Sequence, residues 1–231
     1  MTSRSYKQLC GLAYALDVVG ERWTLLIIRE LMPGPRRFTD LIDGLPGIST
    51  NLLSGRLRRL EEQGLIRRRD LPPPAASTVY ELTPMGQSLE PMLLELGKWG
   101  SQFVPATPGG DSLLHLGSYA LTLKTFFDPQ KARDLHETYE LRVDGDVLTV
   151  RIADGKIDVW QGESQTPDMV LHAGMPTYMA LLLGHLPPQD AIAGGHVRVE
   201  GDVQTLTRFL DLCGVPSLEE RAIRSVTTIA E

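Results

Sequence analysis

Arginine side chains gather in one stretch of this 231-residue chain. Residues 36–69 contain eight arginines against four acidic residues. A guanidinium group can donate two parallel hydrogen bonds to a phosphate or to the edge of a guanine, which suits such a stretch to nucleic acid. A solvated basic face is the alternative. The spacing of the arginines along the predicted helices and strands decides between the two.

A helix is predicted over residues 49–63, in the middle of this stretch. Ser49 is a suitable N-cap, because its hydroxyl can accept a backbone N–H of the first turn, and Gly64 ends the helix. At about 100° per residue, one face consists of leucines: Leu53, Leu57 and Leu60. The other face consists of small and polar residues: Asn51, Ser54, Gly55 and Arg58, with Arg59 on the flank. A leucine stripe opposed by such a face is typical of a helix that lies in the major groove of DNA.

The neighbouring segments predict the rest of a DNA-binding module. Helices are predicted over residues 20–32 and 38–45, and prolines end the first of them. Strands 66–71 and 78–82 flank a proline-rich loop, which indicates a hairpin with an extended tip. This order of elements is that of a winged helix-turn-helix.

Basic residues outside the third helix are expected to touch the DNA backbone. Arg67 and Arg69 alternate onto one face of the hairpin, where phosphate or minor-groove contact is expected and simple solubility of an edge strand is the alternative. Arg36 and Arg37 precede the second helix, whose N-terminus attracts anions. The expected DNA contacts are Arg36, Arg37, Thr39, Ser49, Thr50, Asn51, Ser54, Gly55, Arg58, Arg59, Arg67 and Arg69.

One long helix is predicted from Thr83-Pro84 to Val104, with apolar residues three and four apart. This apolar set is wider than one domain covers, so part of it is expected to join two copies of the chain; a helix buried within its own domain is the alternative. The expected dimer contacts are Leu89, Leu93, Leu96, Trp99, Gly100 and Phe103. Two subunits would place their DNA-reading helices about 34 Å apart on a pseudo-palindromic operator.

Composition and charge divide the chain in two. Residues 105–111 hold two prolines and two glycines without apolar periodicity, which indicates a linker. Residues 1–104 carry 13 basic and 11 acidic side chains, a net of +2, whereas residues 105–231 carry 10 and 18, a net of −8. The predicted domains are 1–104 for DNA binding and dimerisation and 112–231 for a second role.

The second domain is predicted to be an α+β domain. Strands are expected over 139–143, 147–153, 156–161 and 169–173, with tight Asp-Gly turns after the first two. Helices and one more strand follow them. The predicted fold class of the whole chain is therefore α+β, with an N-terminal winged helix-turn-helix and a C-terminal antiparallel sheet with helices.

Six segments of the first domain together resemble the HxlR family of bacterial regulators. They are GERWTLLIIREL (20–31), GPRRF (34–38), LPGIS (45–49), LSGRL (53–57), LEEQGL (60–65) and YELTPMG (80–86). The resemblance implies a dimeric winged-helix transcription factor that binds operator DNA. Members often carry a cysteine near the position of Cys10, which in some of them senses electrophiles or oxidants, although the proline that usually follows is Gly11 here. An inert thiol is the alternative.

The second domain resembles the sterol carrier protein type 2 domain over about residues 112–213. The resemblance rests on the successive hairpins and on MALLLG (179–184), AIAGG (191–195) and VRVEGD (197–202). It implies that a small apolar or lipid-like effector lies between sheet and helices. The expected lining is Phe126, Phe127, Tyr178, Met179, Leu182, Leu183 and Phe209, with ordinary core as the alternative for each.

Other functional classes lack their sequence signals. No nucleophile elbow, P-loop, dinucleotide fingerprint or zinc-protease motif occurs, and the five histidines have no metal-ligand spacing. No enzyme activity, cofactor or metal is therefore expected. Apolar runs stay below the ~18 residues of a membrane span, and two cysteines make no disulfide framework, so a cytoplasmic protein without a membrane partner is expected.

These observations predict a transcriptional repressor that binds operator DNA as a homodimer and responds to an apolar effector in its second domain. Two alternatives stay open. One is a lipid-binding or carrier protein whose winged helix mediates protein contacts. The other is a redox-sensing regulator that acts through Cys10.

Overall fold

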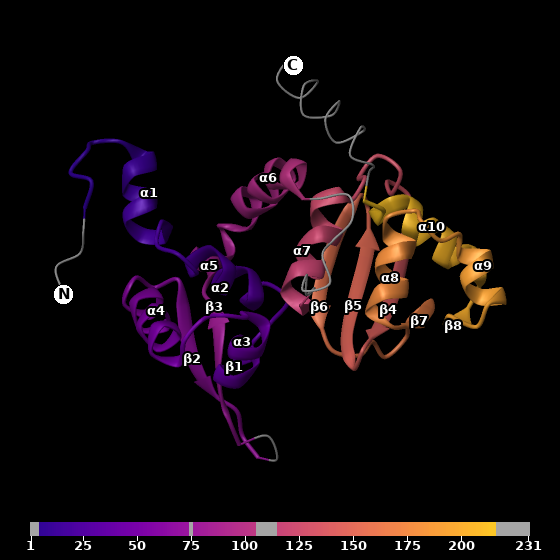
Figure 1. Ribbon diagram of the computed structural model, residues 1–231, viewed down its shortest axis with the longest axis horizontal. Helices are drawn as coiled ribbons and strands as arrows, with labels where there is room; N and C mark the ends of the chain where they lie inside the picture. The colour runs from indigo at the N-terminus through magenta and orange to yellow at the C-terminus, as the bar shows by residue number, and fades with distance from the viewer. Residues whose placement is uncertain (1–4, 74–75, 105–114, 216–231) are drawn as a thin grey trace. The chain divides into compact units, whose positions relative to one another are not determined.

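The computed structural model describes residues 5–73, 76–104 and 115–215 (Figure 1). The chain divides into two compact units, Met1–Leu93 and Leu94–Glu231, with the boundary inside helix α6, Glu90–Gly100. The expected linker, 105–111, lies outside the described residues. The domain bounds 1–104 and 112–231 stay predictions.

The N-terminal unit combines short helices with a small sheet. Its helices, apart from the start of α6, are α1 (Gly11–Val19), α2 (Thr24–Leu31), α3 (Phe38–Gly44), α4 (Thr50–Glu62) and α5 (Pro84–Gln87). Its strands are β1 (Arg36–Arg37), β2 (Ile66–Asp70) and β3 (Thr78–Leu82), paired antiparallel in the order β1-β3-β2. The β2–β3 hairpin projects beyond the helices as a wing (Figure 1). The predicted winged helix-turn-helix is confirmed.

Helix α4 begins and ends as its sequence predicts. The Ser49 hydroxyl accepts the backbone N–H of Leu52 at 3.3 Å. At the other end Gly64 has a φ of +72°, and the next N–H, of Leu65, donates to the Leu60 carbonyl at 3.0 Å. This glycine-ended turn satisfies carbonyls that the helix leaves free. The leucine stripe of α4 is 0–1% exposed and joins the core.

Two predicted helices have wrong bounds, and one helix was missed. The helix expected over 20–32 begins at Thr24, because Trp23 before it has a left-handed φ of +79°. The helix expected from Thr83 to Val104 is broken into α5 and α6, followed by a short 3-10 helix, Ser101–Phe103. Pro91 explains the break between α5 and α6, because a proline in a continuous helix could not donate to the carbonyl four residues earlier and would clash with it. Helix α1 was not predicted at all.

The C-terminal unit is a five-stranded sheet with helices on one face. Its elements are α7 (Leu116–Phe126), β4 (His136–Val143), β5 (Asp146–Ala153), β6 (Lys156–Gln161), β7 (Met169–Ala173), α8 (Met175–Leu182), α9 (Pro188–Ala193), β8 (Val197–Gly201) and α10 (Val203–Cys213). The strand order is β6-β5-β4-β7-β8. The α+β fold class is confirmed, but the sheet is mixed rather than antiparallel, because β4 and β7 pair in parallel.

The parallel pair follows from a polar crossover between β6 and β7. The Glu140 carboxylate accepts the backbone N–H of Ser164 at 2.8 Å, and the Thr149 hydroxyl donates to the Gly162 carbonyl at 2.7 Å. These bonds hold the connecting segment 162–168 against the sheet face that carries Glu140. The chain therefore crosses β5 and β4 before it pairs again, instead of turning back as a hairpin.

The two sheet faces of this unit differ in polarity. Tyr139, Leu141 and Val143 of β4 are fully buried, together with side chains of α7, α8 and α10. Strand alternation turns Glu140 and Arg142 to the opposite face. The core of this unit therefore lies between the sheet and its helices. Among the residues that the structure describes, no helix has the length and apolar content to cross a membrane.

Candidate nucleic-acid interface

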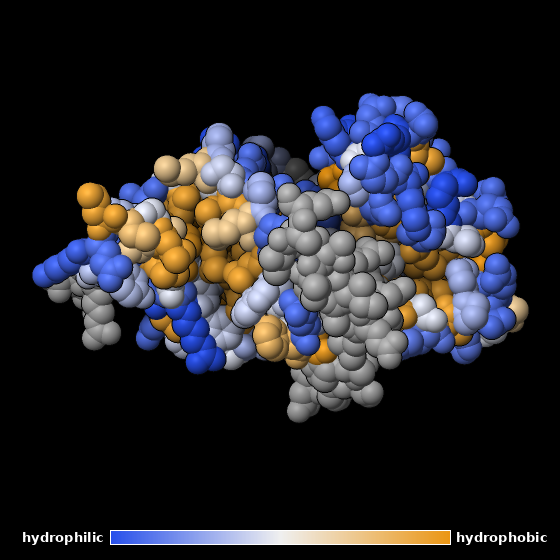
Figure 2. Space-filling model, turned by 90° about the horizontal axis from the view of Figure 1, so that it is seen from above, coloured by the Kyte–Doolittle hydropathy of each residue, from blue (hydrophilic) through white to orange (hydrophobic). Residues whose placement is uncertain are grey.

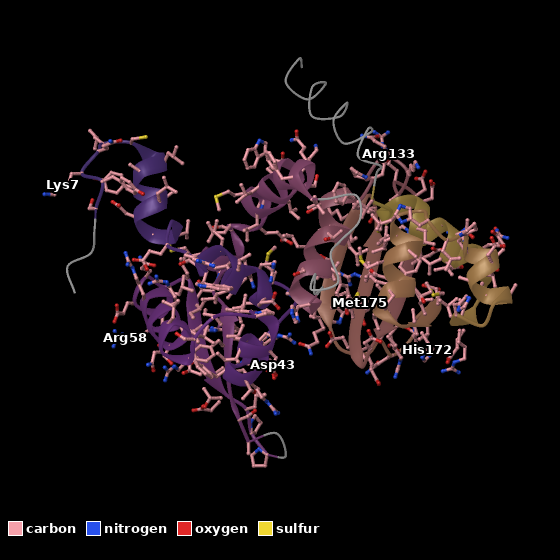
Figure 3. All side chains as sticks on the ribbon, viewed as in Figure 1. Lys7, Asp43, Arg58, Arg133, His172 and Met175 are labelled. Carbon is pink, nitrogen blue, oxygen red and sulfur yellow. The ribbon has the colours of Figure 1, made fainter. Side chains whose placement is uncertain are left out.

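Helix α4 presents the expected polar face to solvent. The exposed residues of this face are Ser49, Thr50, Asn51, Ser54 and Arg58. Outside the helix's own turns, no atom lies within 4 Å of the position that a Cβ would take at Gly55. The Arg58 side chain is 73% exposed, with its Nε 3.8 Å from a Glu62 oxygen. Figure 3 shows Arg58 on the outer side of α4, so this surface is open to a base edge.

Arg59 lies differently from the flanking DNA contact that was expected. Its guanidinium donates to a Glu21 oxygen at 2.5 Å and to the Asp17 carbonyl at 3.0 Å. Arg56, which was not among the expected site residues, also pairs with Glu21 and donates to the Arg22 carbonyl at 3.3 Å. Two arginines of α4 thus tie this helix to the end of α1 and the turn after it. Their spacing of three residues, one helical turn, was the signal for a shared partner.

Arg36 and Arg37 lie on opposite sides of β1. Arg36 is 7% exposed, with its guanidinium 4.0 Å from fully buried Glu30. Strand alternation turns Arg36 inward, where the buried carboxylate needs a counter-charge, so the expected surface contact at Arg36 is corrected. Arg37 is exposed, and its backbone N–H donates to Asp40 at 3.0 Å. Arg37 and exposed Thr39 stay predicted contacts.

The wing holds two arginines on one carboxylate. Arg67 and Arg69 donate to the two oxygens of Glu81, at 2.7 and 2.9 Å. Partial burial favours a higher pKa for Glu81, but the hydrogen bonds and charges of both arginines outweigh it and lower that pKa. Arg68 points to the other face, with its guanidinium 5.4 Å from the ring centre of Tyr80. Arg67 and Arg69 therefore share one face of the hairpin, as expected, and Arg68 lies on the other.

The expected dimer residues are only partly exposed. Leu93 is 5% exposed and contributes to the core, while Leu89 and Gly100 are half-buried. The exposed members of the set are Leu96, Trp99 and Phe103, and the last two stack edge to face at 5.0 Å.

Helix α1 adds an apolar surface that was not predicted. Leu12, Tyr14 and Leu16 are exposed, whereas only Ala13 and Val19 of this helix are buried. Figure 2 shows hydrophobic side chains at the surface where Figure 1 draws α1. The succession of apolar residues over 12–19 could have predicted the helix, but not which face is left open.

Cys10 is the exposed N-cap of α1. Backbone N–H groups of Ala13 and Leu12 lower the pKa of its thiol. Cys213 is buried at the end of α10, and burial raises the pKa of that thiol. The two cysteines are therefore opposite in accessibility and in thiolate character.

The expected ligand-lining residues divide into two groups. Tyr178, Leu182 and Phe209 are 0–2% exposed and belong to the core between sheet and helices. The half-buried members of the set are Phe126, Phe127, Met179 and Leu183. The structure thus places three of the seven in one core, and half-buried Phe127 packs against that core. Tyr139, missed by the sequence, packs on Phe209 with ring centres 4.9 Å apart.

A hollow of about 500 Å³ lies on the outer sheet face of the C-terminal unit. Arg142, His172 and Arg198 line it from three neighbouring strands, in register with one another (Figure 3 labels His172). Each of them is engaged by a neighbouring side chain; His172 and Arg198, for example, both meet Glu200. In the described parts of the chain, no three His, Cys, Asp or Glu side chains are placed to hold a metal ion.

The fold and the exposed face of α4 define the class of this protein as a winged helix-turn-helix protein with a second, sheet-and-helix domain. Residues 18–108 match the model of the HxlR-like helix-turn-helix family, and residues 122–214 match that of the SCP-2 sterol transfer family. The chain belongs to the HxlR-like helix-turn-helix family, and it is a transcriptional regulator of that type. Both resemblances seen in the sequence are confirmed.

Several relatives share the N-terminal part. The uncharacterized HTH-type transcriptional regulator sll1512 of Synechocystis is 38% identical over 96 residues, 42% of this chain and 71% of that protein. The HTH-type transcriptional regulator YodB of Bacillus subtilis is 37% identical over 89 residues, 38% of this chain and 80% of that protein. Among solved structures, the reduced form of YodB is 33% identical over 44% of this chain and 100% of that one, with a TM-score of 0.38. The redox regulator HypR in its reduced form is 29% identical to this chain. The match covers 40% of this chain and 91% of HypR, also with a TM-score of 0.38.

Proposed function

We propose that this protein is a repressor that binds a pseudo-palindromic operator as a homodimer, with α4 in the major groove. The observation that carries the proposal is the division of α4 into a buried leucine stripe and an open face of Asn51, Ser54 and Arg58. An arginine can read guanine and an asparagine can read adenine in that groove. The wing arginines Arg67 and Arg69 lie on the same domain and suit the neighbouring phosphates.

The apolar surfaces of α1 and α6 support the dimer. Leu12 is 69% exposed and Trp99 60% exposed in the single chain. Burying such side chains against a second copy would stabilise the assembly by about 25 cal/mol for each Å² of apolar surface. A two-fold dimer would set its two reading helices about 34 Å apart.

The test of DNA reading is substitution of Arg58. We expect Arg58→Ala to weaken operator binding by about 1–3 kcal/mol and to relax preference at one base position. Fluorescence anisotropy with an operator selected from the host genome, and with single-base variants of it, measures both effects. Arg133→Ala is the matched control, because Arg133 is an exposed arginine of the C-terminal unit (Figure 3). A loss equal for every base variant would refute base reading by Arg58.

Salt dependence separates this proposal from a carrier whose winged helix only mediates protein contacts. Each phosphate contact should add ~0.9 to the slope of log K against log salt concentration. We expect a steep slope for the whole protein on operator DNA. A flat response would favour the carrier.

The C-terminal unit supplies the proposed effector site. Its match to the sterol transfer family and its core of aromatic side chains support an apolar or lipid-like effector. To change DNA binding, the effector must bind one arrangement of the dimer more tightly, and a tenfold preference supplies about 1.4 kcal/mol. Native mass spectrometry of the protein from its own host would reveal a retained small molecule, and adding that molecule should then change operator affinity. No change would refute the effector role.

Redox control through Cys10 is a second candidate function, favoured by the exposure of this thiol and its lowered pKa. Solved relatives of the N-terminal part include the redox regulator HypR and YodB of Bacillus subtilis in quinone-bound and diamide-treated forms. If Cys10 is a sensor, diamide should change operator affinity of the natural protein and leave Cys10→Ser unchanged. The same response in both proteins would refute it.

A further inference from the structure

Among the described residues of the C-terminal unit, the Tyr178 hydroxyl is one of several buried polar atoms without a hydrogen bond, and it lies in the core between the sheet and its helices. Tyr178 of α8 is 0% exposed, and its hydroxyl makes no hydrogen bond in the described structure. Its ring packs edge to face on Tyr119 of α7, with centres 5.6 Å apart. Buried polar groups in folded proteins are nearly always hydrogen-bonded, and one that is not costs stability. An unpartnered hydroxyl inside a domain of the sterol transfer type therefore points to a missing acceptor.

The state of this hydroxyl defines what the acceptor must offer. Burial, followed by the nearby Tyr119 phenol and Cys213 thiol, raises the pKa of Tyr178 well above its usual value. The group thus stays protonated and can donate a hydrogen bond. Its partner must present an oxygen or nitrogen with a free lone pair.

The charged residues near this core favour a neutral acceptor for the Tyr178 hydroxyl over a charged one. The described residues of the C-terminal unit that are buried include no lysine or arginine, and their one buried carboxylate, Glu140, is bonded to Arg142 on the opposite sheet face. At the helix side, Arg208 is engaged by Glu137, which also accepts the Tyr139 hydroxyl at 2.5 Å. A carboxylate or phosphate placed beside Tyr178 would lack a counter-charge, which makes its burial costly.

We infer that the effector proposed for this domain is a neutral apolar molecule with one oxygen acceptor, such as a ketone, ester or alcohol, and that the Tyr178 hydroxyl donates a hydrogen bond to that oxygen. This inference rests on the proposed effector site. It excludes fatty acids and other anionic lipids as the preferred class, and it also separates the effector from a plain hydrocarbon, which would leave the hydroxyl unpaired.

Three probes of one chain length test the inference on the whole protein. Decane, 2-decanone and decanoate compete with the neutral fluorescent probe N-phenyl-1-naphthylamine. We expect 2-decanone to compete at about 5–10-fold lower concentration than decane or decanoate, the effect of one neutral hydrogen bond. Tyr178→Phe should reduce that advantage over decane to about 1-fold, since phenylalanine keeps the apolar ring.

Stability of the ligand-free protein is the second readout. Tyr178→Phe removes an unpaired hydroxyl, so its Tm should equal or exceed that of the natural protein. Tyr139→Phe is the matched control, because it removes a hydroxyl bonded to Glu137 and should lower the Tm while keeping the preference for the ketone.

Each outcome has a separate meaning. Binding of the probes with an unchanged ketone preference in Tyr178→Phe, or tightest binding of decanoate, would overturn the inference and leave the effector site standing. A lower Tm for ligand-free Tyr178→Phe would show that the hydroxyl is already bonded in the core, which also overturns it. Failure of the natural protein to bind the fluorescent probe or any of the three competitors would overturn both the inference and the proposed effector site.

Discussion

We expect the wing carboxylate Glu81 to oppose DNA binding, and we expect its neutralisation to strengthen that binding. Arg67 and Arg69 both donate to Glu81, so a phosphate that either arginine binds must approach the same carboxylate. With a guanidinium between them, the two anions would lie about 7 Å apart, where their repulsion is about 0.6 kcal/mol in water and about 2.4 kcal/mol at an effective dielectric of 20. Solvent screening at the wing favours the lower value.

For a dimer with two wings, Glu81→Gln should therefore strengthen DNA binding by about 5–10-fold. Each arginine released to a phosphate should also steepen the log–log salt slope by ~0.9. Loss of two ion pairs at an exposed wing should lower the free energy of unfolding by only about 0.5–1 kcal/mol. Fluorescence anisotropy at several salt concentrations and urea unfolding measure these three quantities. Glu163→Gln is the control, because it makes the same change of net charge on an exposed residue of the C-terminal unit.

The lowered pKa of Glu81 predicts in which direction its contribution to stability changes with pH. Because the folded pKa of Glu81 lies below the ordinary value of 4.5, its stabilisation is complete above that value and is lost as pH falls through the folded pKa. At about pH 6–8 the natural protein and Glu81→Gln should thus differ by a constant amount. Weaker DNA binding by Glu81→Gln, with a shallower salt slope, would refute this reasoning and show that the carboxylate instead orients the two arginines for DNA.

Three further experiments test the core of the N-terminal unit, the dimer interface and the reactivity of the two thiols. Leu57→Ala should lower the free energy of unfolding by about 2–5 kcal/mol in urea titration, because Leu57 is 0% exposed in the leucine stripe of α4; a loss well below this range would mean that the stripe is not core. Leu12→Asp should shift sedimentation toward the monomer without a matching loss of helix by circular dichroism, whereas an unchanged dimer would exclude α1 from the interface. Cys10 should react with a disulfide reagent at neutral pH while Cys213 reacts only on unfolding, and equal rates in the folded protein would contradict the opposite pKa shifts of the two thiols.

Local signals predicted much of the DNA-binding unit. The cap at Ser49, the terminating Gly64 and the leucine spacing fixed α4 because helix ends and one helix face depend on neighbours in sequence. The hairpin was predicted for the same reason. Pro91 is also a local signal, which could have predicted the break between α5 and α6. The apolar periodicity across residues 89–103 instead led to the prediction of one continuous helix.

Features that depend on distant partners were not predictable in this way. Whether an arginine faces DNA or a carboxylate depends on where the chain brings an acid: Glu21 lies 38 residues before Arg59, and buried Glu30 lies beside Arg36. The parallel pairing of β4 with β7 depends on hydrogen bonds of the crossover to Glu140 and Thr149. The unpartnered hydroxyl of Tyr178 is visible only when the surrounding core is complete.

Hydrogen bonds of Asp17 connect helix α4 to the residues that precede α1. The Asp17 carboxylate accepts the Ser5 hydroxyl at 2.8 Å and the Tyr6 N–H at 3.0 Å, while its backbone carbonyl accepts Arg59 of α4. The segment around Ser5 and Tyr6, a few residues before Cys10, is thus bonded to the same residue as the helix that would enter the groove. We therefore expect any modification or subunit movement that pulls Ser5 and Tyr6 away from Asp17 to loosen the contact of Asp17 with Arg59 and so to change how α4 binds the operator.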